Sequence, residues 1–179
     1  MIRKILAGLG LLILLVLIVA AFQPDDLRVE RQATIAAPAA VVFAKVNDFT
    51  QWPSWSPWEK LDPNMKRTLS GPTSGKGAIY AWTGNSDVGE GRMTITDSRP
   101  GELVRIHLEF IKPFAATNTT DFAFKPEGGQ TAVTWTMTGK NNYMSKLFGL
   151  FMNMDKMIGG DFERGLAQLK AVSEGARKT

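Results

Sequence analysis

Side chains able to do acid–base or nucleophilic chemistry are few in this sequence. The chain has no Cys and one His, which excludes a thiol nucleophile, a disulfide framework and a Cys/His zinc site. Histidine is the side-chain type that ordinarily titrates near neutrality. The alternation around His107 puts it opposite an apolar face, beside Arg105 and Glu109. We therefore predict a solvated position on a sheet, because a catalytic base would have to face a cavity.

The carboxylates are scattered. Glu90 shares its strand phase with an arginine two residues on, which favours a surface pair. Asp155, Asp161 and Glu163 are either an acid group at the mouth of a cavity or one solvated face of a helix, and we favour the helix face. No grouping has convincing metal-ligand spacing. The sequence thus predicts no metal site and no cofactor, and assigns no catalytic residue.

A glycine-rich loop and the net charge both argue against nucleotide or nucleic-acid partners. The segment 71–77 (GPTSGKG) resembles a phosphate loop, but its spacing is one residue short and Lys76 precedes Gly instead of Ser or Thr. The formal charge is +4, without a dense basic cluster outside the extreme termini. We expect no nucleic-acid partner.

The strongest pattern is an apolar stripe near the C-terminus. From about Tyr143 to Ala176, apolar residues recur every three or four positions, which predicts one long helix with a buried face. The stripe comprises Leu147, Phe151, Met154, Ile158, Phe162, Leu166, Leu169 and Val172. Four methionines near its start serve either ordinary core packing or a deformable ligand wall hinged at Gly159-Gly160.

Short alternating runs precede this helix and predict its packing partner. Leu27–Ala36 is expected to be a strand and Pro38–Val46 a short helix. From Met65 to Gly139, runs separated by Gly, Pro and Asn indicate the remaining strands of a set of six or seven. In Glu102–Phe110, apolar and polar residues alternate cleanly, which is typical of an antiparallel sheet with one solvated face. Glycines between 71 and 91 predict bends that curl this sheet.

A tryptophan-rich turn follows the short helix. Trp52, Trp55 and Trp58 are three residues apart, and the two prolines between them forbid a long helix. These rings are either a packed plug at one end of the core or an aromatic wall for an apolar ligand.

The N-terminal segment predicts a membrane helix. Ile5–Phe22 carries no charge and as a helix would span about 27 Å, close to the ~30 Å hydrocarbon core of a bilayer. A signal peptide cleaved near residues 19–21 is the alternative to an uncleaved anchor, which we favour. The basic pair Arg3-Lys4 orients the remainder to the extracytoplasmic side, the periplasm in a Gram-negative cell. We expect residues 1–26 to form anchor and linker, and 27–176 one domain.

Several strings resemble the SRPBCC superfamily, the START-like, polyketide cyclase/dehydrase and lipid-transport group, in its membrane-anchored bacterial members. They are RQATIAAPAAVVFAKVNDFTQWPSWSPW, SGPTSGKGAIYAWTGN, VGEGRMTI and MDKMIGGDFERGLAQLK. The resemblance implies an α+β helix-grip fold, in which a curved antiparallel sheet surrounds a long C-terminal helix and leaves an apolar cavity. Members bind lipids, sterols or polyketides, and some are cyclases or hydratases. No catalytic motif of those enzymes maps onto this chain. Ala40 departs from the acidic residue often found two positions after the helix-opening proline.

These observations predict a membrane-anchored module that holds a hydrophobic small molecule or lipid. A cyclase or dehydratase and a protein-interaction module using the Trp turn are the alternatives, with no protein partner identified. The predicted cavity wall comprises Trp52, Trp55, Trp58, Tyr80, Trp82, Met93, Phe110, Phe122, Trp135, Met137, Phe151, Met154 and Ile158.

Overall fold

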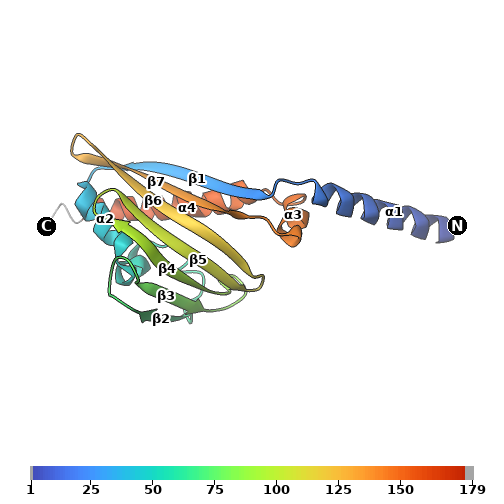
Figure 1. Cartoon of the computed structure of the whole chain (residues 1–179), viewed down its shortest axis with the longest axis horizontal. Coiled ribbons are helices and arrows are strands. Elements are labelled where there is room, and N and C mark those ends of the chain that lie inside the picture. The colour runs from blue at the N-terminus through green and yellow to red at the C-terminus, as the bar shows by residue number, and fades with distance from the viewer. Residues whose placement is uncertain (1, 176–179) are drawn as a thin grey trace.

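The computed structural model describes residues 2–175, which form an N-terminal helix followed by a curved sheet and its gripped helix (Figure 1). In chain order the elements are α1 (Ile2–Ala21), β1 (Asp26–Ile35), α2 (Ala39–Asn47), the 3-10 helix η1 (Phe49–Ser54), β2 (Lys66–Ser70), β3 (Ile79–Thr83), β4 (Glu90–Arg99), β5 (Leu103–Lys112), β6 (Ala116–Glu127), β7 (Gln130–Lys140), α3 (Tyr143–Gly149) and α4 (Met154–Gly175).

Seven antiparallel strands form one sheet in the order β1-β7-β6-β5-β4-β3-β2. Strands β2 to β7 follow one another as neighbours, as short turns require, while β1 pairs with β7 along its whole length. The sheet curves around α4, and α1 projects from one end of the domain (Figure 1). This arrangement confirms the predicted helix-grip architecture with its six to seven strands.

The core lies between the inner face of the sheet and α4. Phe162, Leu166 and Leu169 on α4 are almost fully buried, as the apolar stripe predicts. The Phe162 ring stacks on the Trp135 ring of β7, with centroids 4.0 Å apart and planes 7° from parallel. Contacts of this kind fix how closely α4 approaches the sheet.

The predicted single C-terminal helix is two helices, and this corrects the expected position of the break. The chain leaves helical geometry at 150–153, not at Gly159-Gly160, which lie inside α4. Side-chain capping explains where each helix starts. Asn142 Oδ1 accepts from the Ser145 backbone N–H at 2.8 Å, and Asn153 Oδ1 accepts from that of Lys156 at 2.9 Å.

An arginine of the edge strand fastens α4 to the sheet. Arg31 Nε donates to Glu163 Oε1 at 2.7 Å, and Arg31 Nη2 donates to Asp155 Oδ2 at 3.0 Å. Between these two acids lies Gly159, where a Cβ atom would come 2.0 Å from the guanidinium. Asp155 and Glu163 are 59% and 64% exposed, in agreement with the predicted solvated helix face, and they also bind Arg31.

The ion pairs of Arg31 with Asp155 and Glu163 predict that the stability of the fold depends on pH. The hydrogen bond from Arg31 lowers the pKa of Asp155 below its usual 3.8. A depressed pKa in the folded state adds stability above the unfolded value, and that stability is lost as pH falls through the folded pKa. We expect Asp155→Asn to lower the melting temperature slightly at about pH 6, because Asp155 is largely exposed, and this difference to shrink below pH 3.8. Circular dichroism melts of both proteins across this range measure it, and a constant difference would contradict the assignment.

Candidate functional site

One end of the grip, beside α2 and η1, is closed by aromatic packing. Trp52 and Trp55 are buried, and their centroids are 4.7 Å apart. Each indole N–H is used by α2, because Trp52 Nε1 donates to the Val46 carbonyl at 2.9 Å and Trp55 Nε1 to the Lys45 carbonyl at 3.1 Å. The Trp turn therefore acts here as the packed plug, one of its two predicted roles, and Trp58 is half-buried beside Trp135.

The opposite end of the grip, toward α1, is less tightly filled. The strand register aligns Met93 with Leu108, Leu108 with Asn118, Asn118 with Gly139, and Gly139 with Leu27. These residues form one row across the inner face of the sheet. The three apolar side chains of the row are only half-buried, in contrast to the core rows nearer α2. An apolar surface thus remains accessible at this end.

A groove of about 980 Å³ lies at the same end, around the last β6–β7 pair, Asn118 with Gly139. Phe110, Ala116, Asn118 and Gly139 reach it from the inner face of the sheet. Its outer-face residues include His107, Glu109, Ile111 and Thr119. Most of the lining residues therefore lie on the outer face, and the groove opens to solvent at the edge of the half-buried row, from which Asn118 and Gly139 reach it.

The inner wall of the groove carries a buried amide. Asn118 is 6% exposed and faces inward in phase with Phe122 and Phe124. Gly139 on β7 is the register partner of Asn118. A Cβ atom at Gly139 would come 1.8 Å from Asn118 Oδ1, so the amide occupies the space that a side chain there would need. Because an amide both donates and accepts hydrogen bonds, this position suits a hydroxyl, carbonyl or carboxylate on an otherwise apolar ligand.

Two further buried polar atoms lie on the same inner face. Within residues 2–175, Thr120 Oγ1 and Trp135 Nε1 have no hydrogen-bond partner. Thr120 follows Asn118 inward along β6, and Trp135 lies on the neighbouring strand. Unpaired buried polar atoms are costly, so each is a position where a bound polar group or a water molecule would be stabilising.

The predicted wall residues separate into four groups. Phe110 lines the groove. Trp52, Trp55, Tyr80, Phe122, Trp135 and Met137 are buried in the core, and Trp58, Trp82, Met93, Met154 and Ile158 are half-buried. Phe151 corrects the prediction, because it lies in the break between α3 and α4 and is 73% exposed instead of facing the interior. Asn118 was missed, although its inward phase with Phe122 and Phe124 is visible in the sequence.

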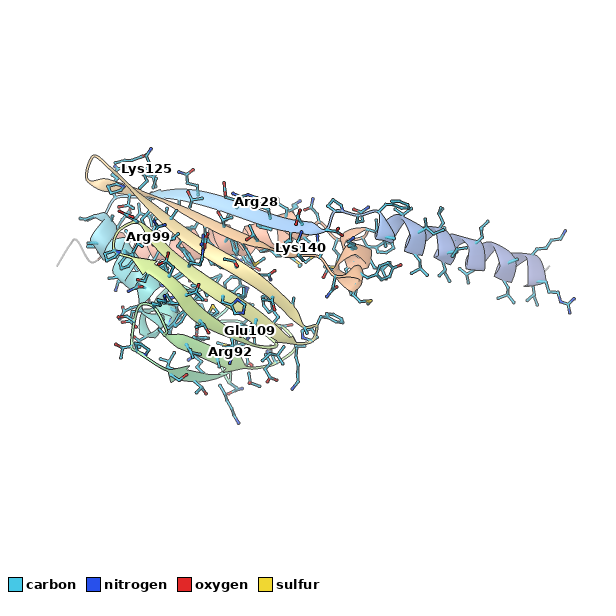
Figure 2. The ribbon with its side chains drawn as sticks, in the orientation of Figure 1. Arg28, Arg92, Arg99, Glu109, Lys125 and Lys140 are labelled. Atoms are coloured by element: carbon cyan, nitrogen blue, oxygen red, sulfur yellow. The ribbon has the colours of Figure 1, made fainter. Side chains whose placement is uncertain are left out.

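The predicted acid–base candidates do not face the interior. His107 is 42% exposed on the outer face, 4.0 Å from Glu109, as its strand phase predicts. The outer face carries several ion pairs, such as that of Arg92 with Glu109 (Figure 2). Glu90 pairs with Lys112, and Asp161 with Arg164. Among residues 2–175, no group of three or more His, Asp or Glu side chains is placed to hold a metal ion.

The buried acid that the sequence did not reveal is Glu59. Its Oε1 accepts from the Tyr80 hydroxyl at 2.6 Å, and its Oε2 lies 2.7 Å from Arg67 Nη2. Burial, and then the neighbouring Glu59 carboxylate, raise the pKa of Tyr80 well above its usual value, so the phenol stays protonated and donates. The hydrogen bond and the ion pair link the residue that follows the Trp turn to β3 and β2.

Comparison with known proteins identifies a matching family and several solved structures of similar fold. A family model described as polyketide cyclase / dehydrase and lipid transport matches residues 26–174. No curated protein matches the sequence.

Three solved structures illustrate the shared fold. Protein CV1439 from Chromobacterium violaceum has a TM-score of 0.59 at 15% identity, over 85% of this chain and 99% of its own. The di-domain ARO/CYC protein StfQ from the steffimycin biosynthetic pathway has a TM-score of 0.63 at 10% identity, over 87% of this chain and 53% of its own. Ara h 8.0201 has a TM-score of 0.57 at 10% identity, over 84% and 99%. At these identities the likeness establishes the fold.

Proposed function

The chain belongs to the polyketide cyclase / dehydrase and lipid transport family, and from that premise we propose that it is a membrane-anchored module binding a hydrophobic small molecule or lipid. The observation that carries this proposal is the groove of about 980 Å³ at the α1 end of the grip. Its lining combines the apolar side chains of Phe110, Ile111 and Ala116 and the buried Asn118 amide with polar and charged side chains of the outer face. Such a mixed lining suits an amphipathic ligand, with an apolar body and polar groups.

The anchor rests on α1. An 18-residue window of this helix has a mean hydropathy of 2.7 and carries almost no buried side chains. Its length and composition suit a membrane span and also a signal sequence. Retention of α1 is supported by its contacts with the domain. Ala20 is fully buried, and the Tyr143 hydroxyl donates to the Leu17 carbonyl at 2.9 Å. Cleavage near residues 19–21 would remove that contact. Arg3 and Lys4 favour an extracytoplasmic domain.

The alternatives have less support. A cyclase or dehydratase needs an ionisable group free to act on the ligand. The buried acid Glu59 is engaged by Tyr80 and Arg67. Of the ionisable groups that line the groove, Glu109 is paired with Arg92 and His107 lies on the exposed outer face. A partner site on the Trp turn needs exposed rings, whereas Trp52 and Trp55 are 2% and 0% exposed. The exposed groove therefore supports ligand binding more directly than it supports catalysis or a partner site on the Trp turn.

Displacement of a fluorescent fatty acid, together with native mass spectrometry of the full chain in mild detergent, tests this function. We expect co-purified lipid and saturable probe binding. Gly139→Val should weaken probe binding at least about tenfold, because the new side chain displaces the Asn118 amide and fills the groove. Thr134→Val places the same side chain on the outer face of the same strand and should leave binding unchanged. Absence of bound lipid together with absence of probe binding would refute the proposal.

A further inference from the structure

Exposed apolar side chains gather at the end of the domain that carries α1. Two segments far apart in sequence supply them: the β5–β6 loop and the stretch from α3 to the start of α4. They meet through Phe114 and Phe148, whose ring centroids are 5.7 Å apart. We call this surface the apolar collar, and it comprises Phe114, Tyr143, Met144, Phe148, Phe151 and Met152, each between 41% and 73% exposed.

The collar is held at the level of the last turns of α1. The Tyr143 hydroxyl donates to the Leu17 carbonyl, and the Asn141 side chain donates to the Pro24 carbonyl at 3.1 Å. Since α1 ends at Ala21, Leu17 lies about 6 Å inside the helix end. Figure 1 shows α3 beside the α1–β1 connection. If α1 crosses a bilayer, α3 must therefore lie at the depth of its boundary.

The chemistry of the collar suits that depth. Aromatic rings with one polar tip, such as Tyr143, favour the region between headgroups and acyl chains. Interfacial helices place their apolar face about 5–10 Å into that boundary. The acidic groups nearby are neutralised, because Lys146 pairs with Asp25 and lowers the pKa of that carboxyl, and Lys140 pairs with Asp26. Little negative charge then opposes contact with an anionic lipid surface.

We propose that the apolar collar docks on the leaflet of the bilayer that α1 spans, with the lipid surface as its partner. This inference rests on the membrane anchor in the proposed function. Ala115, Ala116 and Asn142 line the groove and adjoin collar residues along the chain. Docking therefore places the groove at the membrane, and a lipid-borne ligand reaches it without crossing bulk water.

Because the chain has no Cys, single labelled cysteines test this docking directly. The full chain is reconstituted into phosphatidylcholine vesicles with an environment-sensitive fluorophore on Phe148→Cys, and in a second variant on Phe151→Cys. Leu12→Cys reports insertion of α1, and Lys125→Cys reports the end of the sheet opposite α1 (Figure 2). With nitroxide-labelled lipids, we expect strong quenching at 148, 151 and 12 but not at 125.

Each other outcome has a definite meaning. If position 12 is quenched but positions 148 and 151 are as weakly quenched as position 125, docking of the collar is overturned and the membrane anchor stands. Loss of quenching at 12 overturns the anchor and docking together. If the label at position 148 shows energy transfer between protein copies and no quenching by lipid, the collar binds a second copy of the chain, and the lipid surface is not its partner. Fatty-acid binding measured on the same vesicles separates the ligand proposal, since it can fail while docking holds.

Discussion

Replacing Trp135 with Ala is expected to lower the free energy of unfolding by about 3–5 kcal/mol, the range typical of a large aromatic residue removed from a core. Trp135 is 2% exposed and contacts four rings. Its centroid lies 4.0 Å from that of Phe162 on α4 and 4.6 Å from that of Phe122 on β6. The Trp55 and Trp58 centroids lie 5.9 and 5.8 Å away. Truncation would leave a cavity where the sheet, the Trp turn and α4 meet.

Urea unfolding of the full chain in mild detergent, followed by circular dichroism, measures this loss. Thr134→Ala, on the outer face of the same strand, is the matched control and should change stability by less than about 0.5 kcal/mol. A loss near zero for Trp135→Ala would mean that the inward face of β7 has been assigned wrongly.

The strand interiors were predictable because their side chains obey a simple alternation. On β7, the alternation of Val133, Trp135 and Met137 with threonines predicts one inward face, and all three are buried. On β5 the same rule placed Val104 and Ile106 inside and His107 outside. Period two suffices for such strands because each packs on one face only.

The junction between α3 and α4 could not be predicted from the same kind of pattern. Apolar periodicity continues through 150–153, so only the capping side chains Asn142 and Asn153 signal two helix starts. Gly159-Gly160 suggested a hinge because glycine disfavours helices. In the fold, Gly159 instead makes room for Arg31, a residue more than a hundred positions earlier that β1–β7 pairing brings near. Contacts between residues so far apart in the chain produce no local sequence pattern from which they could be predicted.

The groove was hidden for a related reason. Residues lining it come from both faces of the sheet around the last β6–β7 pair, which no single-strand pattern reveals. Asn118 had an inward phase, but a polar residue on an apolar face looks like an irregularity until its buried surroundings are known. Glu59 likewise became recognisable as buried only through Tyr80 and Arg67.

The second large effect is expected at Gly165, where α4 packs closely against Trp135 of the sheet. At Gly165, a Cβ atom would lie 2.7 Å from Trp135 Cζ3 and 3.1 Å from Pro57 Cδ. The indole cannot retreat, because Phe122 and Phe162 pack against it. Gly165→Leu should therefore cost about 1–3 kcal/mol of stability, even though Leu favours helices more than Gly does. The same urea titration measures it.

Gly160→Ala supplies a control of opposite sign in the same helix. There the nearest atom to a new Cβ would be Arg164 Nη1 at 3.7 Å, an ordinary contact. Relief of the glycine penalty should then stabilise the protein by about 0.5–1 kcal/mol. If both substitutions stabilise, α4 does not press on Trp135 at Gly165 and the grip is looser than described. If both destabilise, the backbone at 160 is needed for something other than the helix, and the proposed geometry of α4 against β1 fails there.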